Sequence, residues 1–182
     1  ILRSNPANHR RGATSRKHLM SAWAFRDHLI DSDPDQIEAM VRGTEFFSPE
    51  EISIARELAD DALANGDGSH YRFALADKDG SLAAYACFGR IPGTRLAWDL
   101  YWIVVAPAVQ SQGLGGQLLR EVEARVASAG GDRLYVETSS REQYAPTRRF
   151  YAGCGFHKAA EFPDFYAPGD GKIVYVSLLT TT

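Results

Sequence analysis

The residues best suited to chemistry lie in a glycine-rich turn that follows a predicted strand. The strand covers residues 97–105, and Gly113 and Gly115 come just before a predicted helix. A helix start presents unpaired amide groups and the positive end of the helix dipole, and glycine lets an anion come close because it has no Cβ. The pattern predicts a phosphate-binding turn built from the main chain, although such turns also occur for purely structural reasons. A P-loop is excluded because residues 116–118 are Gly-Gln-Leu, and a dinucleotide fingerprint is excluded because Leu118 stands where it needs glycine.

This turn and a second segment together resemble the GNAT superfamily of acetyltransferases. Residues 110–115 (QSQGLG) are similar to the Q/R-x-x-G-x-G/A signature of that family, which also follows the fourth strand. Residues 149–156 (RFYAGCGF) are similar to its aromatic-Tyr-x-x-x-Gly-Phe element, at a comparable distance along the chain. Residues 164–170 (DFYAPGD) resemble a loop of one bacterial GNAT subgroup. The resemblance covers roughly residues 71–179.

The resemblance implies an α/β fold of GNAT type, with a central mixed sheet of six to seven strands flanked by about four helices. It also implies acetyl-CoA as cosubstrate, with the pyrophosphate on the turn and the pantetheine arm beside the fourth strand. The strand would contribute main-chain contacts from Ile103, Val104 and Val105, which can also be ordinary core residues. The turn would contribute pyrophosphate contacts from Gln110, Ser111, Gln112, Gly113, Leu114, Gly115 and Gly116. Tyr144 stands where many family members have Asn, so that side-chain contact to the pantetheine is not expected.

Tyr151 matches the family tyrosine that lies near the CoA sulfur and acts as a general acid. A departing thiolate, whose conjugate acid has a pKa of about 8.5, gains from a nearby proton donor. The structural alternative is a core tyrosine that packs through its ring. Because the adjacent Phe150 could fill the core, we favour the catalytic role.

Asp99 is the first candidate for the base that removes a proton from an amine. It stands eleven residues before Gln110, where the histone-acetyltransferase branch of the family carries a glutamate base. Strand periodicity places four residues on one side of the strand: Asp99, Tyr101, Ile103 and Val105. Asp99 could instead pair with an arginine such as Arg90, or act through a water because Asp is shorter than Glu. Glu137 is the substitute base, with the alternative that its charge stabilises the start of the next helix.

The rest of the pattern predicts the elements that position these residues. Residues 22–30 form a predicted first strand, and two helices follow, one from Pro34 and one from Pro49 to near Gly66. The later elements are strands over 71–76, 81–90 and 97–105, a helix over 114–126, a strand over 133–138, a helix over 146–152, and strands over 156–162 and 172–179. A helix that connects two parallel strands is typical of a mixed α/β layer fold.

Composition excludes several classes of protein. The chain has 182 residues, and no apolar run approaches the roughly 20 residues of a membrane helix. Its net charge of −3 disfavours a dedicated nucleic-acid binder. The five histidines and the two cysteines, Cys87 and Cys154, fit neither a metal site nor a disulfide scaffold, so we expect no metal and a cytoplasmic location. Residues 1–20 carry five basic and no acidic side chains, which predicts a flexible basic extension before one domain over residues 21–182.

These observations predict an N-acetyltransferase that moves the acetyl group of acetyl-CoA to a primary amine of a small molecule or peptide, in a ternary complex. The alternative is a CoA-binding regulatory module without turnover. An interaction domain that exposes Phe46-Phe47 and Phe165-Tyr166 is a third reading, although these aromatics would better wall an acceptor pocket. Residues 27–67 hold 12 acidic side chains, which form either a solvated surface or an attraction for a cationic acceptor. A homodimer is possible, and neither nucleic acid nor membrane is an expected partner.

Overall fold

The computed structural model describes residues 23–179, and the predicted basic extension lies outside this range. A seven-stranded mixed sheet has the order β1-β2-β3-β4-β5-β7-β6. Its strands are β1 (Ala24–Arg26), β2 (Arg72–Lys78), β3 (Ser81–Arg90), β4 (Ala97–Val105), β5 (Arg133–Ser139), β6 (His157–Ala167) and β7 (Asp170–Leu178). The α-helices in the described range are α1 (Asp33–Gly43), α2 (Pro49–Asn65), α3 (Leu114–Ser128) and α4 (Ala145–Gly153). The predicted fold class is confirmed.

Local chemistry explains where several elements begin. Ser48 accepts a hydrogen bond from the Glu51 amide, and the Glu51 carboxylate accepts one from the Ser48 amide, which forms a capping box before α2. The turn between β2 and β3 has positive φ angles at Asp79 (51°) and Gly80 (80°), as a tight hairpin requires. These short-range signals make the helix and hairpin boundaries predictable from the sequence.

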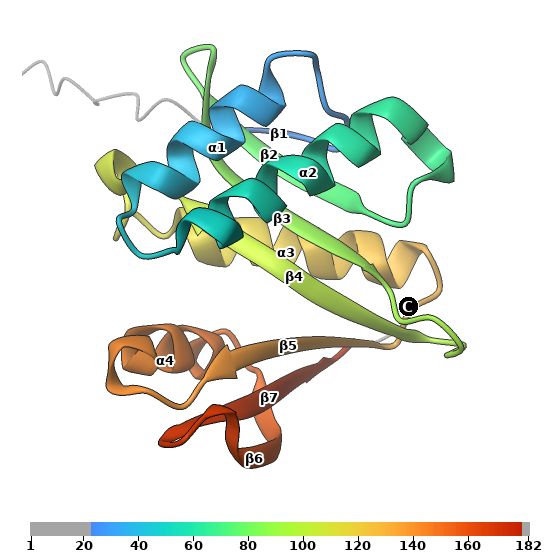
Figure 1. Cartoon of the computed structure of the whole chain (residues 1–182). Helices are drawn as coiled ribbons and strands as arrows, with labels where there is room; N and C mark the ends of the chain where they lie inside the picture. The colour runs from blue at the N-terminus through green and yellow to red at the C-terminus, as the bar shows by residue number, and fades with distance from the viewer. Residues whose placement is uncertain (1–22, 180–182) are drawn as a thin grey trace, which may run out of the picture.

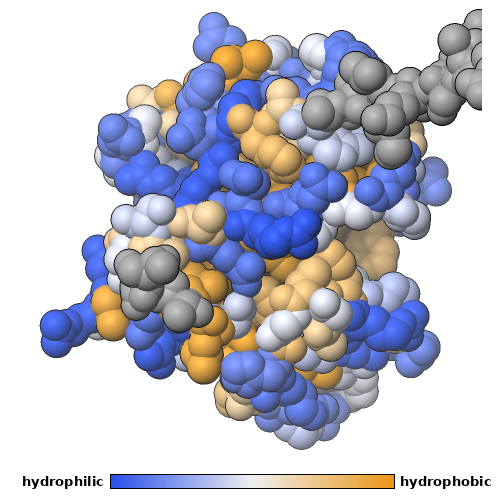
Figure 2. Space-filling view, turned by 180° about the vertical axis from the view of Figure 1, so that it is seen from behind, coloured by the Kyte–Doolittle hydropathy of each residue, from blue (hydrophilic) through white to orange (hydrophobic). Residues whose placement is uncertain are grey.

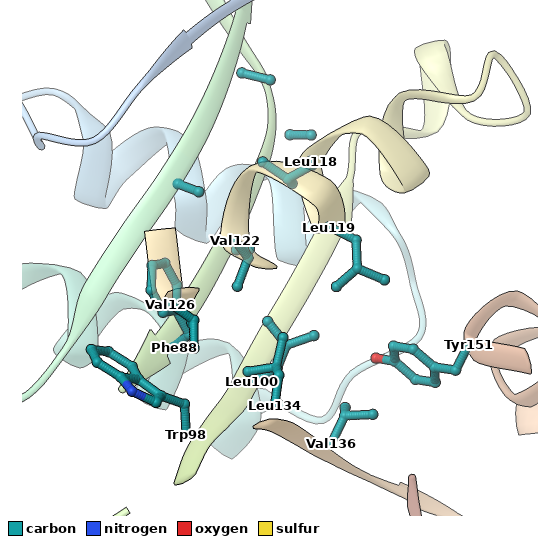
Figure 3. Packing of buried hydrophobic residues seen from close by; sticks show 14 of the residues in the cluster. Phe88, Trp98, Leu100, Leu118, Leu119, Val122, Val126, Leu134, Val136 and Tyr151 are labelled. Atoms are coloured by element: carbon teal, nitrogen blue, oxygen red, sulfur yellow. The ribbon is translucent and has the colours of Figure 1, made fainter. Parts of the chain in front are cut away.

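Helices cover both faces of the first half of the sheet, with α1 and α2 on one face and α3 on the other (Figure 1). The buried side of α3 packs on β3, β4 and β5; Figure 3 shows its residues Leu118, Leu119, Val122 and Val126 with strand residues Phe88, Trp98, Leu100, Leu134 and Val136. Seen from behind, hydrophilic residues cross the middle of the molecule, where α3 presents its outer side (Figure 2). Burial of this apolar stripe at about 25 cal/mol per Å² fixes α3, and hence the turn before it, against β4.

The parallel strands β4 and β5 pair over only part of their length. In the described chain their register runs from Ala97 opposite Arg133 to Leu100 opposite Val136 and stops there. Toward the C-terminal end of β4, Figure 1 shows β5 diverging toward α4. On its other edge, β4 stays paired with β3 as far as Val105. Residues 101–105 therefore have one main-chain edge that no strand of the sheet covers.

A β-bulge lies at the point where β4 and β5 part. Cys87 lies opposite Trp102, but Phe88 lies opposite Leu100, so Tyr101 is the extra residue of β4. Bulges bend a strand and increase its twist, which accounts for the divergence from β5. Because of the bulge, the prediction that Asp99, Tyr101, Ile103 and Val105 all lie on one side of β4 is wrong. Asp99 and Tyr101 share one face, whereas the later residues Ile103 and Val105 pack in the core on the α3 side.

Two strands differ most from their predicted bounds, and the others differ by no more than two residues at either end. The first strand is only three residues long, because the chain bends after Arg26, whose guanidinium pairs with Asp33 at 2.6 Å and Asp77 at 2.7 Å. The strand predicted to end at Phe162 continues as β6 to Ala167, with an irregular register between these residues. The expected loop is therefore the far end of a β6–β7 hairpin.

Candidate functional site

The glycine-rich turn presents main chain without intruding side chains. Gly113 is the N-cap of α3 with φ 79°, and a Cβ there would meet nothing within 4 Å. A Cβ on Gly115 would lie 3.4 Å from the Phe150 ring and 3.5 Å from Val105 Cγ2. Gln110 Nε2 donates to the Val105 carbonyl at 3.1 Å, which ties the turn to the end of β4. The predicted glycine-rich turn is thus formed, and the first amides of α3 have no side-chain cap, as an anion-binding turn would require.

Arg120 adds a positive charge beside the turn. One Nη atom of its guanidinium lies 3.7 Å from the position of a Cβ on Gly116, one helical turn earlier. Sequence reasoning missed this residue, although the i,i+4 spacing on α3 predicts that both residues lie on one side of the helix. The turn therefore combines amide donors with a cation, which suits an anionic ligand.

The three predicted strand residues lie in the part of β4 that β5 does not cover. Val104 is buried in the core beneath α1 and α2, while Ile103 and Val105 are partly buried on the α3 side. Their side chains serve the core, and the main-chain edge beside them lies next to the turn. Both predicted readings of these residues, core packing and a backbone available for contact, are compatible with this arrangement.

Tyr151 projects from α4 toward the strands, with its hydroxyl leading, and lies near Val136 and Leu119 (Figure 3). Its side chain is 4% exposed, and its ring contacts Phe150 and Phe156 at centroid distances of 5.4 and 5.7 Å. Burial raises the pKa of this phenol, and the Cys154 thiol adds to the rise. Phe150 is only partly buried, so the ring that fills the core here is that of Tyr151, not that of Phe150 as expected. The hydroxyl keeps its proton over the physiological range.

Asp99 is a half-buried carboxylate on β4, opposite Gly89 of β3 and Tyr135 of β5. Loss of hydration raises its pKa, and the negative charge of Glu137 adds to the rise. The alternative pairing with Arg90 is not formed, because that guanidinium donates to the Arg95 carbonyl at 2.6 Å. Asp99 therefore takes up a proton more readily than an exposed aspartate.

Glu137 and Lys172 lie on the same face of the sheet as Asp99. We call this the polar face, defined by Asp99, Glu137 and Lys172, since strand register places these residues on one side of β4, β5 and β7. Lys172 Nζ is 3.0 Å from Glu137 Oε1 and 4.1 Å from the centroid of the Phe165 ring. The ion-pair partner of Glu137 is thus a lysine of β7, which neither predicted role of Glu137 anticipated.

A tyrosine and a histidine extend the polar face. Tyr101 Oη lies 3.0 Å from His70 Nε2, and burial together with Asp99 raises the pKa of Tyr101 to about 12. Gly89 makes room for this contact, since a Cβ there would lie 2.7 Å from the His70 carbonyl oxygen and 3.0 Å from the Tyr101 ring. His70 carried no signal in the sequence, because its position depends on the pairing of β3 with β4.

Three further observations bear on the classes considered from the sequence. Within residues 23–179, His, Cys, Asp and Glu side chains form no group of three that could hold a metal ion. None of the helices in that range combines the length and the apolar character that a membrane crossing requires. Cys87 is buried in the core, and burial raises the pKa of its thiol.

Comparison with known proteins identifies the family. The model of the acetyltransferase (GNAT) family matches residues 36–156. A crystal structure from Desulfovibrio desulfuricans, described as a GNAT-family acetyltransferase, is 44% identical, has a TM-score of 0.86, and covers 87% of this chain and 100% of its own. No curated protein gives a match.

More distant structures share the fold. An aminoglycoside 6'-N-acetyltransferase complexed with coenzyme A has a TM-score of 0.69 at 17% identity, covering 86% of this chain and 97% of its own. The protein yncA from Salmonella typhimurium, with its cofactor acetyl-CoA, has a TM-score of 0.68 at 18% identity, covering 88% and 95%. Because the family model spans most of the chain and the D. desulfuricans protein is 44% identical over nearly all of it, this chain belongs to the GNAT family of acetyltransferases.

Proposed function

We propose that this protein is an N-acetyltransferase that transfers the acetyl group of acetyl-CoA to a primary amine by direct attack in a ternary complex. The observation that carries the proposal is the uncovered edge of β4, residues 101–105, next to the uncapped start of α3. Two structures that share the fold contain coenzyme A or acetyl-CoA. We also propose that the chain belongs to one bacterial subgroup of the GNAT family, because its residues 164–170 resemble a loop found in that subgroup.

The residues of the turn fit a diphosphate. Main-chain amides of residues 110–116 would hold it, since Gly113 leaves open space at the start of α3, and Gly115 lets α3 pack closely against Phe150 and Val105. Arg120 would add a charge-assisted contact. Ile103, Val104 and Val105 would bind the pantetheine arm through the free main-chain edge of β4. When bound, acetyl-CoA supplies an acetyl group activated as a thioester.

Asp99 is the proposed base. An alkylammonium of pKa near 10 must lose a proton before its nitrogen can attack a carbonyl. The raised pKa of Asp99 makes it a stronger base than an exposed aspartate. Glu137 is held by Lys172 and serves less well. Because the Asp side chain is short, we propose that it accepts the proton through a water.

Tyr151 is the proposed acid. Its hydroxyl is directed from α4 toward the gap in strand pairing (Figure 3). The raised pKa of this phenol keeps the proton available for a thiolate leaving group. Its buried ring holds the hydroxyl in a defined position, since the surrounding aromatic side chains restrict its rotation.

Release of free thiol from acetyl-CoA tests the proposal. The purified protein is incubated with acetyl-CoA and a panel of primary amines, and CoA binding is measured in parallel. We expect thiol release that depends on the amine. Tight CoA binding without turnover for any amine would favour the regulatory module instead, and absence of CoA binding would refute both.

A further inference from the structure

A hydrogen-bonded pair of side chains connects the polar face with the surface of the molecule. Tyr101 Oη lies 3.0 Å from Nε2 of His70, which comes two residues before β2. His70 is exposed, whereas Tyr101 and Asp99 are partly buried. An imidazole in contact with solvent is thus bonded to a hydroxyl that lies inside the site.

Gly89 brings the Tyr101 hydroxyl beside Asp99. Gly89 lies directly opposite Asp99 in the pairing of β3 with β4. A Cβ on Gly89 would lie 3.1 Å from Tyr101 Oη, so this hydroxyl lies in the space that a side chain of residue 89 would fill. Side chains in such opposite positions have Cβ atoms about 4.5–5.5 Å apart. The phenol is therefore the cross-strand neighbour of the Asp99 carboxylate, within the reach of one bridging water.

The β-bulge of β4 produces this arrangement. Tyr101 is the extra residue at the bulge, and bulges commonly redirect a side chain next to a functional site. The Tyr101 ring lies over Gly89 and meets the rings of Tyr71 and His70 at centroid distances of 5.8 and 6.3 Å. These contacts hold the hydroxyl between the carboxylate and the imidazole.

The Tyr101 phenol is suited to pass a proton on without becoming charged. Burial and the charge of Asp99 raise its pKa to about 12, and Cys87 and Tyr71 add to the rise. The phenol therefore keeps its proton at neutral pH. Its oxygen can accept a proton while its own proton moves to the bonded imidazole nitrogen, since a hydroxyl is both donor and acceptor.

The other side of the polar face offers a poorer proton acceptor. Burial and Glu137 raise the pKa of Asp99, whereas Lys172 and His70 oppose the rise. Lys172 Nζ lies 3.0 Å from Glu137 Oε1, which stabilises that carboxylate as an anion and weakens it as a base. An acceptor bound on the polar face would also keep bulk water away from Asp99. The remaining route to solvent passes through Tyr101 and His70.

We infer that Tyr101 and His70 carry the proton of the acceptor amine from Asp99 to solvent, an inference that rests on the proposed acetyltransfer. Asp99 takes the proton from the ammonium group through a water and then gives it up toward Tyr101 Oη. As that oxygen accepts the proton, the hydroxyl donates its own to His70 Nε2. His70 releases its Nδ1 proton and regains its first tautomer by exchange with bulk water. Asp99 is thereby restored as a base, and no net charge stays in the site.

Chemical rescue tests the role of His70. Thiol release from acetyl-CoA is followed with the amine of the panel that supports the fastest turnover, with and without added imidazole. Without imidazole and at low buffer concentration, His70→Ala should lower kcat about tenfold at an unchanged KM, less than the roughly 10²-fold loss expected of the base itself. Imidazole should restore kcat to within about twofold of the wild type. His28→Ala, at another exposed histidine, is the control and should match the wild type in every buffer.

Tyr101→Phe interrupts the same path one step further inside. The ring and its contact with Tyr71 persist, so the variant removes the hydroxyl alone. We expect kcat to fall as far as in His70→Ala, without rescue by imidazole. The double variant should lose no more than either single variant, because both residues act in one path.

The direction of the hydrogen bond is tested without substrates. Because Tyr101 donates to Nε2, neutral His70 should carry its proton on Nδ1, and nitrogen NMR of the imidazole distinguishes the two tautomers. A proton on Nε2 in the wild type, His70→Ala without rescue, or losses that multiply in the double variant would each overturn the inference and leave acetyltransfer standing. No thiol release by the wild type with any amine would instead count against the proposed function.

Discussion

Replacement of Tyr151 by Phe isolates the proposed proton donor from its structural surroundings. The substitution removes one oxygen and keeps the ring, whose contacts with Phe156 at 5.7 Å and Tyr175 at 6.2 Å persist. The free energy of unfolding should therefore change by no more than about 1 kcal/mol. Tyr151→Ala would be uninformative, because loss of a buried aromatic ring costs about 3–5 kcal/mol.

Loss of a general acid lowers kcat by on the order of 10²-fold, which corresponds to about 2.7 kcal/mol in the activation barrier. Steady-state assays of thiol release give kcat, and calorimetry gives the Kd of CoA, which should stay within about twofold. Tyr175→Phe is the matched control, since it removes the same oxygen from a neighbouring ring. An unchanged kcat in Tyr151→Phe, or an equal loss in Tyr175→Phe, would refute the acid role.

Three further predictions concern charge and stability. Because the pKa of Asp99 is raised, kcat/KM should begin to fall toward acid pH at a pH above the pKa of an ordinary aspartate. Glu137→Gln removes a like charge and frees Lys172, so the acid limb of the pH–rate profile should move to lower pH, and a move to higher pH would contradict this. Arg120→Met should weaken CoA binding about 2–5-fold in calorimetry, with no change if the guanidinium does not face the ligand. Ser48→Ala should lower the free energy of unfolding by about 1 kcal/mol in urea denaturation, and an unchanged midpoint would show that the capping box contributes nothing.

The raised pKa of Asp99 also predicts the sign of a stability effect. A carboxylate whose pKa is higher in the folded than in the unfolded protein stabilises the fold below its unfolded pKa, and that contribution is lost as pH rises through the folded pKa. At neutral pH, the charged form of Asp99 is therefore less favourable for folding than its neutral form would be. Asp99→Asn should lower activity while leaving Tm unchanged or higher, and a lower Tm would indicate a structural role.

The elements of the fold were predictable because their signals are local. The apolar spacing of α3, the capping box at Ser48 and the turn at Asp79 and Gly80 each depend on residues close together in the sequence. Element order and most boundaries follow from such signals. The glycine-rich turn was predictable for the same reason, since strand, glycines and helix are contiguous.

The features that escaped prediction depend on contacts between distant segments. The bulge at Tyr101 follows from the register of β4 against β3, and it reverses the side on which the later β4 residues lie. The partner of Glu137 is 35 residues away on β7, and that of Tyr101 is 31 residues away at His70. Periodicity along one strand carries no information about such partners. The proposed acid and base were thus chosen by residue type and family resemblance, and the residues that surround them could not be predicted.

The central claim is that the glycine-rich turn before α3 binds the coenzyme. Titration with CoA of a variant that carries a side chain at Gly115 tests it most directly. Gly115→Leu places a side chain where a Cβ already lies 3.4 Å from Phe150, while Gly43→Leu adds the same group at a position with nothing within 4 Å. Calorimetric titration below the Tm of all three proteins should show CoA binding to the wild type and to Gly43→Leu, and binding at least tenfold weaker to Gly115→Leu, whose Tm falls as well because the added side chain meets Phe150 and Val105. Equal affinity in all three proteins, or no uptake of CoA by the wild type, would contradict the assignment of this turn to the coenzyme.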